Sequence, residues 1–159
     1  MDCVINALQL MNVLDETAAN IMRISTLGMF GFTKEQIEVI FMYKAGHNFS
    51  FVPTMNYQEW STRITTLLPP GNVVFAGYET QTGSKHVFLI GRFANGRLVY
   101  IDPQRPPMCL LDSPACERNV NGEGQRAWYL LFHSTIPLTT ANTDTLIAYT
   151  QALQRQGRP

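Results

Sequence analysis

Cys3, His86 and Asp102 are the residues whose types could act together on an amide bond. A cysteine attacks as its thiolate, and a nearby histidine can accept the proton that the thiol loses. A carboxylate beside that histidine fixes the tautomer of the ring and favours the imidazolium. These three residue types therefore indicate a nucleophilic cysteine site, in the chain order Cys3, His86, Asp102.

A hairpin predicts how His86 and Asp102 come together. Residues 94–96 (Ala-Asn-Gly) suit a three-residue loop with glycine in the left-handed conformation, so that Phe93 pairs with Arg97. This register makes His86 and Asp102 diagonal neighbours on one face, about 7–8 Å apart at the backbone. A shift of one residue would place them on opposite faces.

A short helix is expected to carry the thiol. Val4, Ile5, Leu8 and Met11 fall on one face of a helix that Cys3 begins. Unpaired backbone N–H groups and the helix dipole lower the pKa of a thiol at such a position. We therefore expect an activated thiolate at Cys3.

The remaining N-terminal half is expected to be mainly helical, because capping residues precede apolar residues at helical spacing. We expect, in order, a helix from Asp15 to Gly28, a helix from the capping box at Thr33 to Gly46, a strand or extended connector from His47 to Pro53, and a helix from Asn56 to Leu68.

The second half changes to segments rich in β-branched and aromatic residues, separated by turn residues. We expect strands over Asn72 to Glu79, Lys85 to Phe93, Arg97 to Asp102 and Ala127 to Phe132. Helices followed by antiparallel strands predict the α+β class.

One long segment, Pro103 to Arg126, is predicted to be an irregular loop, and loops of this length are usually functional. A last helix is expected over Thr143 to Gln154. The sequence contains no repeat and no linker, so we expect a single domain over residues 1–154, with a frayed tail over residues 155–159.

Three segments resemble the papain-like cysteine hydrolase superfamily. They are residues 2–8 (Asp-Cys-Val-Ile-Asn-Ala-Leu), residues 85–91 (Lys-His-Val-Phe-Leu-Ile-Gly) and residues 100–104 (Tyr-Ile-Asp-Pro-Gln). That superfamily includes peptidases, deubiquitinating enzymes of the ovarian-tumour and related types, and papain-fold glutamine deamidases. The resemblance implies N-terminal helices that carry the cysteine, packed on a C-terminal antiparallel β-sheet that carries the histidine and the aspartate.

The resemblance also assigns roles by motif position. Cys3 would be the nucleophile, His86 the general base and then acid, and Asp102 the orienting carboxylate. Gln104 would support the site, and the hairpin register places it opposite His86. Peptidases of the papain type carry a glutamine before the nucleophile as an oxyanion-hole donor, and here Met1 and Asp2 precede Cys3. We therefore expect the Cys3 backbone N–H and a second donor, such as a loop amide or Gln104, to form the hole.

Simpler roles exist for each of these residues: Cys3 as a buried apolar side chain, His86 as a strand-end residue and Asp102 as a turn former. His133 also ends an apolar strand and is an alternative general base, although no Asp or Asn occupies a comparable hairpin position beside it. His47 is interpreted as a connector residue.

Cys109 and Cys116 lie in the predicted loop without CxxC spacing, so ordinary thiols are favoured over a zinc site. No metal or cofactor is expected. The chain has 12 basic and 12 acidic residues, which argues against a nucleic-acid or polybasic membrane partner. The apolar runs are too short to span a bilayer, and three cysteines are too few for a disulfide framework. We expect an intracellular protein, with a virus- or bacterium-encoded effector as an extension by analogy.

These observations predict a thiol hydrolase, protease-like or deubiquitinase-like, that cleaves a peptide, isopeptide or amide bond in a protein or peptide substrate, which could include a ubiquitin-like protein. One alternative is a glutamine deamidase acting on a partner protein. Another is a catalytically silent papain-fold protein that serves as an interaction module or a virion-associated component.

Overall fold

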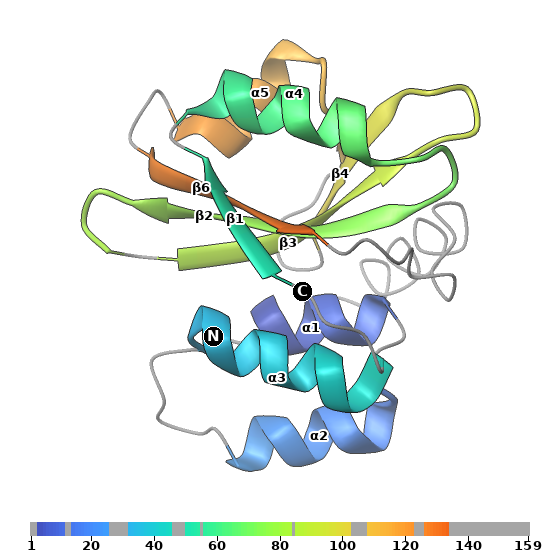
Figure 1. Cartoon of the computed structure of the whole chain (residues 1–159), viewed down its shortest axis with the longest axis vertical. Coiled ribbons are helices and arrows are strands. Elements are labelled where there is room, and N and C mark those ends of the chain that lie inside the picture. The colour runs from blue at the N-terminus through green and yellow to red at the C-terminus, as the bar shows by residue number, and fades with distance from the viewer. Residues whose placement is uncertain are drawn as a thin grey trace.

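The computed structural model describes residues 3–11, 14–25, 32–45, 50–54, 56–83, 85–102, 108–122 and 126–133. A β-sheet lies between two groups of helices (Figure 1). The elements are, in order, α1 (Cys3–Leu10), α2 (Glu16–Ser25), α3 (Lys34–Ala45), β1 (Ser50–Thr54), α4 (Tyr57–Leu67), β2 (Val73–Thr80), β3 (Lys85–Arg92), β4 (Leu98–Ile101), β5 (Cys109–Leu110), α5 (Pro114–Asn121) and β6 (Arg126–His133).

This arrangement confirms the α+β class. Within the described residues the sheet has six strands, in the order β1-β6-β2-β3-β4-β5, and each neighbouring pair is antiparallel. The last strand of the described chain therefore lies between β1 and β2. The helix expected over Thr143 to Gln154 and the tail over residues 155–159 lie outside the described residues.

The predicted helix starts are confirmed by their capping bonds. The Asp15 carboxylate accepts a hydrogen bond from the Ala18 N–H at 2.7 Å. Thr33 and Gln36 exchange bonds in both directions, at 2.9 and 3.1 Å. The Asn56 side chain accepts from the Glu59 N–H at 2.8 Å. Each bond satisfies a backbone donor that has no partner inside its helix, which fixes where the helix begins.

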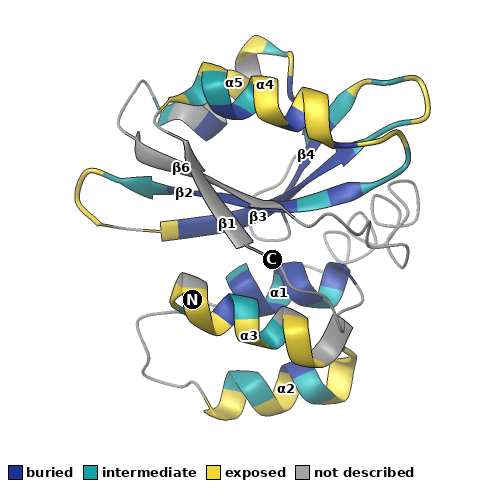
Figure 2. Ribbon diagram, in the orientation of Figure 1, coloured by how far each residue is buried: buried dark blue, intermediate teal, exposed yellow. Residues whose placement is uncertain are grey.

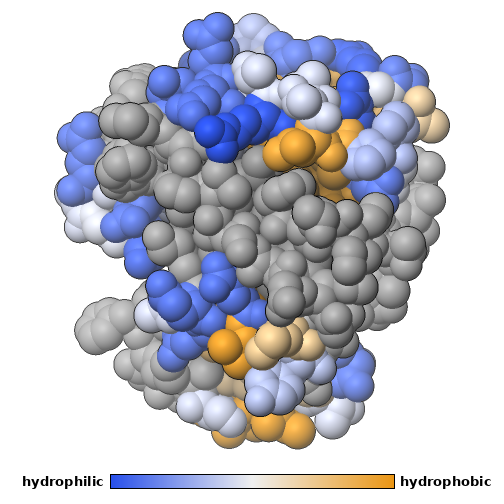
Figure 3. Space-filling model, viewed as in Figure 1, coloured by the Kyte–Doolittle hydropathy of each residue, from blue (hydrophilic) through white to orange (hydrophobic). Residues whose placement is uncertain are grey.

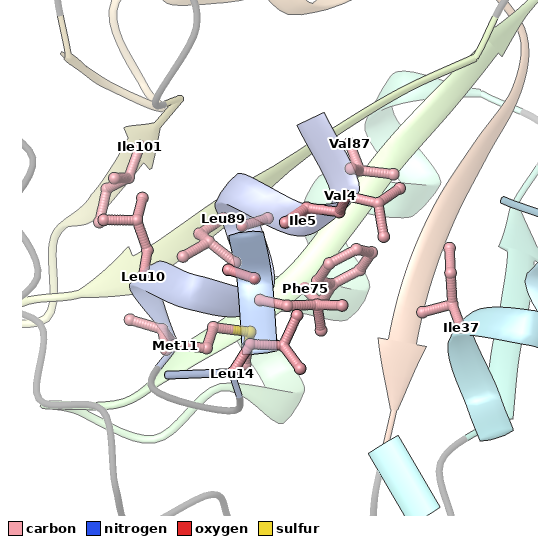
Figure 4. Close-up of a cluster of buried hydrophobic side chains, with 14 of the residues drawn as sticks. Val4, Ile5, Leu10, Met11, Leu14, Ile37, Phe75, Val87, Leu89 and Ile101 are labelled. Carbon is pink, nitrogen blue, oxygen red and sulfur yellow. The ribbon is translucent and has the colours of Figure 1, made fainter. Parts of the chain in front are cut away.

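The two faces of the sheet carry separate hydrophobic clusters. On one face, α1 and α2 pack on side chains that include Phe75 and Leu89 (Figure 4). On the other face, α4 and α5 cover Phe88, Tyr100 and their neighbours. The central strand β3 is buried on both faces from His86 to Gly91 (Figure 2), which explains its continuous apolar run.

The outer sides of α2 and α3 are the most exposed apolar part of the described molecule. Ile24 on α2 and Tyr43 on α3 are 71% and 80% exposed. Hydrophobic side chains also gather at the lower edge of the space-filling view, where Figure 1 places α2 (Figure 3).

The prediction that residues 103–126 form one irregular loop is wrong. The segment contains β5, which pairs with β4, and helix α5. Ser113 caps α5 by accepting from the Cys116 N–H, Pro114 opens the helix, and Gly122 ends it with φ 55°. The helix was missed because it is short and mostly polar, so its apolar periodicity is weak.

Candidate active site

The hairpin between β3 and β4 has the predicted register. The Phe93 N–H donates to the Arg97 carbonyl at 2.9 Å, and Gly96 has φ 90°. The strands pair through Leu89 with Ile101 and onward to Arg92 with Leu98. Continuing this register towards the start of β3 puts the His86 and Asp102 side chains on the same face, as predicted.

His86 and Asp102 are joined by a short, buried hydrogen bond. Nε2 of His86 lies 2.5 Å from Oδ2 of Asp102. The two residues are 6% and 0% exposed, and they are the buried polar residues of the described core. A buried carboxylate needs hydrogen-bond donors to remain charged, and His86 supplies one. Because Nε2 of His86 is hydrogen-bonded to Asp102, the other ring nitrogen, Nδ1, is available for a reaction partner.

Cys3 begins α1, as predicted, and reaches His86 from the opposite side of the sheet. Helix α1 packs on the face that carries Val87 and Leu89, whereas the His86 side chain lies on the other face with Phe88. His86 and Val87 lie beyond the last described pair of β3 with β4, Leu89 with Ile101. At this edge the Cys3 thiol lies near enough to the His86 ring and to the Val87 backbone N–H for both groups to lower its pKa.

The surroundings of Cys3 favour its anion. Burial opposes ionisation, but the His86 ring and the backbone N–H groups of Val87 and Val4 outweigh it, so the pKa of the Cys3 thiol is lowered. The Val4 N–H is one of the unpaired donors at the start of α1. The helix start contributes to the lowered pKa through this N–H, whereas the largest lowering cause is the His86 ring.

His86 shows the complementary change. Burial lowers the pKa of the imidazole, but its interactions with Asp102, which accepts its hydrogen bond, and with Cys3 outweigh the burial, so the pKa of His86 is raised. A lowered pKa on the thiol and a raised pKa on the imidazole both favour the thiolate–imidazolium form of the pair. This is the reactive form of a cysteine nucleophile with its acid–base partner.

Tyr100 is a component of the site that the sequence interpretation did not single out. Its hydroxyl donates to the same Asp102 oxygen that contacts His86, at 2.5 Å. Tyr100 and Asp102 are two residues apart at the end of one strand, and that spacing places both side chains on one face. This alternation was therefore a signal available in the sequence.

Aromatic rings surround the imidazole. The ring centroids of Tyr78 and Phe88 lie 5.7 and 5.9 Å from that of His86, and Tyr78 is the cross-strand partner of His86 on β2. These rings keep water from the hydrogen bond to Asp102, which strengthens it.

Gly77 allows β2 to lie close behind the histidine. A Cβ atom at this position would stand 2.6 Å from the His86 carbonyl oxygen and 3.2 Å from Cγ1 of Val87. Gly77 pairs directly with Val87. Any side chain at Gly77 must therefore move the strand that carries His86.

Of the two other histidines and Gln104, the described structure includes His133. Gln104 and His47 lie outside the described residues, so their expected roles stay predictions. His133 is paired with Ser50 at the end of β6. Tyr78 of β2 pairs with His86 on one side and with Tyr129 of β6 on the other, so Tyr129 is the β6 residue at the level of His86. The His133 backbone is thus about 13 Å along the strand from that level.

Cys109 and Cys116 do not lie in a bare loop, which corrects the sequence interpretation. Cys109 is part of β5, and Cys116 is fully buried in the cluster beneath α5, with Sγ 3.9 Å from the Cys109 carbonyl oxygen. Burial raises the pKa of both thiols. Within the described ranges, no three His, Cys, Asp or Glu side chains are grouped as a metal site would require.

The chain matches no protein-family model, and it matches no curated protein. Among the described residues, no helix has the length and apolar character needed to cross a membrane. The assignment of a function therefore depends on the geometry and the ionisation of the site.

Proposed function

We propose that this protein is a papain-like thiol hydrolase that cleaves a peptide, isopeptide or side-chain amide bond through a thioester on Cys3. The observation that carries the proposal is the continuous row of Cys3, His86 and Asp102, in which the pKa of the thiol is lowered and that of the imidazole is raised. A cysteine that only filled space in a core would have a raised pKa, as Cys116 has.

In the first half-reaction, the Cys3 thiolate attacks the carbonyl carbon and forms a carbon–sulfur bond, and the carbonyl oxygen becomes an oxyanion. The His86 imidazolium then gives its Nδ1 proton to the leaving nitrogen. The carbon–nitrogen bond breaks, the amine departs, and the acyl group remains on Cys3 as a thioester. Asp102 stabilises the imidazolium and holds the ring so that Nδ1 faces the thiol.

In the second half-reaction, neutral His86 takes a proton from a water molecule, which attacks the thioester carbonyl. The carbon–sulfur bond breaks, the acyl group leaves as a carboxylic acid, and the thiolate–imidazolium pair is restored. The unpaired N–H groups at the start of α1 are suited to stabilise the oxyanion in both steps, beginning with the backbone N–H of Cys3.

The proposed substrate is a protein or peptide, with ubiquitin-like conjugates as one class. The same thioester chemistry on a glutamine side chain would be deamidation, because the bond broken is then the side-chain amide and the leaving group is ammonia. Intact-mass analysis separates the two activities: hydrolysis of a backbone or isopeptide bond yields fragments, whereas deamidation raises the mass of the partner by about one dalton.

The test of the proposal is peptide-resolved alkylation by iodoacetamide between pH 4 and 10. We expect Cys3 to react at pH values where an unperturbed thiol is protonated, and about 100-fold faster than Cys116 at pH 6.5. Hydrolysis should follow a bell-shaped profile. It should rise as Cys3 ionises and fall as the pH passes the raised pKa of His86, because the leaving nitrogen needs the imidazolium proton. Equal, slow labelling of the three cysteines would refute the proposal.

A further inference from the structure

We infer that Tyr100 is a positioning residue of this site: its hydroxyl holds Oδ2 of Asp102 against Nε2 of His86. The inference rests on the proposed function, and it extends the row of Cys3, His86 and Asp102 by a fourth residue. The Tyr100 hydroxyl is bonded to Asp102, so its effect on the reaction is exerted through that carboxylate.

The geometry assigns both bonds to one oxygen. Oδ2 of Asp102 lies 2.5 Å from Nε2 of His86 and 2.5 Å from the Tyr100 hydroxyl. A carboxylate can turn about its bond to Cβ, and the favoured angle is broad. A second donor on the same oxygen limits that rotation, and the oxygen stays directed at the imidazole.

The Tyr100 ring is held firmly enough to act as a fixed donor. Tyr100 pairs with Ile90 of β3 on one side and with Cys109 of β5 on the other. Its ring centroid lies 4.8 Å from that of Phe88, and the residue is 2% exposed. Backbone pairing on both sides and close packing leave the hydroxyl little freedom.

The hydroxyl also contributes to the electrostatics of the row. Hydrogen bonds to a buried carboxylate stabilise its charged form. A charged and correctly directed Asp102 raises the pKa of His86, and the resulting imidazolium lowers the pKa of Cys3. The titratable members of the surrounding cluster are Tyr57, Tyr78, Cys109 and Cys116. Burial raises the pKa of the Cys109 and Cys116 thiols, so neither of these two carries a charge at neutral pH.

The test is the pH profile of Cys3 alkylation in the Tyr100→Phe variant, which keeps the ring and removes the hydroxyl. We expect the profile to shift to higher pH, so that alkylation at pH 6 is about tenfold slower than in the wild type. At pH 9.5, where the thiol is ionised in either protein, the two rates should agree within about twofold. A rate change seen at low pH alone shows that the ionisation of Cys3 and His86 has changed, because damage to the fold would change the rate at every pH.

Tyr57→Phe is the matched control. Tyr57 also carries a hydroxyl that donates a hydrogen bond, to the Leu111 carbonyl at 3.3 Å, in the same cluster but outside the row. Its profile should coincide with that of the wild type. All profiles are recorded well below the lowest midpoint of thermal unfolding in the set, so that a loss of stability in Tyr100→Phe does not enter the comparison.

A double-mutant cycle with Asp102→Asn tests whether Tyr100 acts through Asp102. We expect Tyr100→Phe to change the rate at pH 6 by less than about twofold once Asp102 is replaced. A Tyr100→Phe profile that coincides with the wild type, or that shifts to lower pH, would overturn the inference, and so would an undiminished effect in the Asp102→Asn background. A wild-type Cys3 that ionises like an ordinary thiol would overturn both this inference and the proposed function.

Discussion

Free thiols lie in two regions of the described molecule, at the start of α1 and in the segment formed by β5 and α5. The two environments shift the pKa of the thiol in opposite directions. Cys3 meets an imidazole and backbone N–H groups, which lower its pKa although it is partly buried. Cys116 is buried among apolar side chains, and its pKa is raised. Burial opposes the thiolate in both regions, so hydrogen-bond donors and a neighbouring imidazole decide whether the pKa of a buried cysteine is lowered or raised.

The comparison also separates function from stability. The first region contains the polar row of Cys3, His86 and Asp102 beside a hydrophobic core. In the second region, the Cys116 sulfur fills space within the core itself. Substitutions of the residues in the row should therefore change the reactivity of Cys3, and substitutions around Cys116 should change the free energy of unfolding.

The largest effect is expected for His86→Asn. This change removes the imidazole that stabilises the Cys3 thiolate, and alkylation of Cys3 at pH 6.5 should slow by about 100-fold, towards the rate of Cys116. His133→Asn is the matched variant, because His133 is the alternative general base, and it should leave the rate unchanged. If His133→Asn slowed the reaction and His86→Asn did not, His86 would not be the group that lowers the pKa of Cys3.

Gly77→Ala should change both the free energy of unfolding and the rate of Cys3 alkylation. The added methyl group would approach the His86 carbonyl to 2.6 Å, so β3 must move. We expect a loss of about 2 kcal/mol in the free energy of unfolding, measured by urea denaturation, together with slower Cys3 alkylation at pH 6. Gly83→Ala is the control: Gly83 has φ 87° and open space around it, so alanine there should destabilise the turn without changing the alkylation profile. Equal alkylation in both variants would show that the placement of β3 is unimportant for the thiol.

Cys116→Ala should show the opposite pattern to His86→Asn: it should lower the stability of the fold and leave the reactivity of Cys3 unchanged. Removing a fully buried sulfur leaves a small cavity, and we expect a loss of about 1.5 kcal/mol in the free energy of unfolding. Alkylation of Cys3 should be unchanged. Cys109→Ala, at a half-buried position, should lower the free energy of unfolding by less than Cys116→Ala does. A faster or slower Cys3 in the Cys116→Ala variant would mean that the two regions are coupled.

Ser113→Ala should have the smallest effect. The Ser113 hydroxyl oxygen accepts from the Cys116 N–H and caps α5, and its loss should cost about 1 kcal/mol in the free energy of unfolding. Partial opening of α5 should make Cys116 more accessible to alkylation, with Cys3 unaffected. If Cys116 stayed as protected as in the wild type, the cap would not be what holds this thiol in the core.

The parts of the site that depend on local patterns were predictable from the sequence. The turn around Gly96 determines the register of β3 and β4, and that register determines that His86 and Asp102 share a face. The helix that Cys3 begins follows from apolar spacing over a few residues.

Features that depend on long-range packing could not be predicted in the same way. Helix α5 has few apolar residues and forms against a sheet that the local sequence does not contain. The position of β6 between β1 and β2 is set by pairing across the whole chain. The approach of Cys3 to the edge of β3 depends on where the pairing with β4 stops, which periodicity does not report.

The position of β6 in the sheet has a consequence for how the protein is made on the ribosome. Strands β2, β3 and β4 follow one another in the chain and in the sheet, so they can pair as soon as they emerge. Strand β1 is synthesised before them but pairs with β6, and it must wait for that strand. The β3–β4 hairpin with its histidine and aspartate is therefore able to assemble early during translation, whereas β1 has no strand partner until β6 is synthesised.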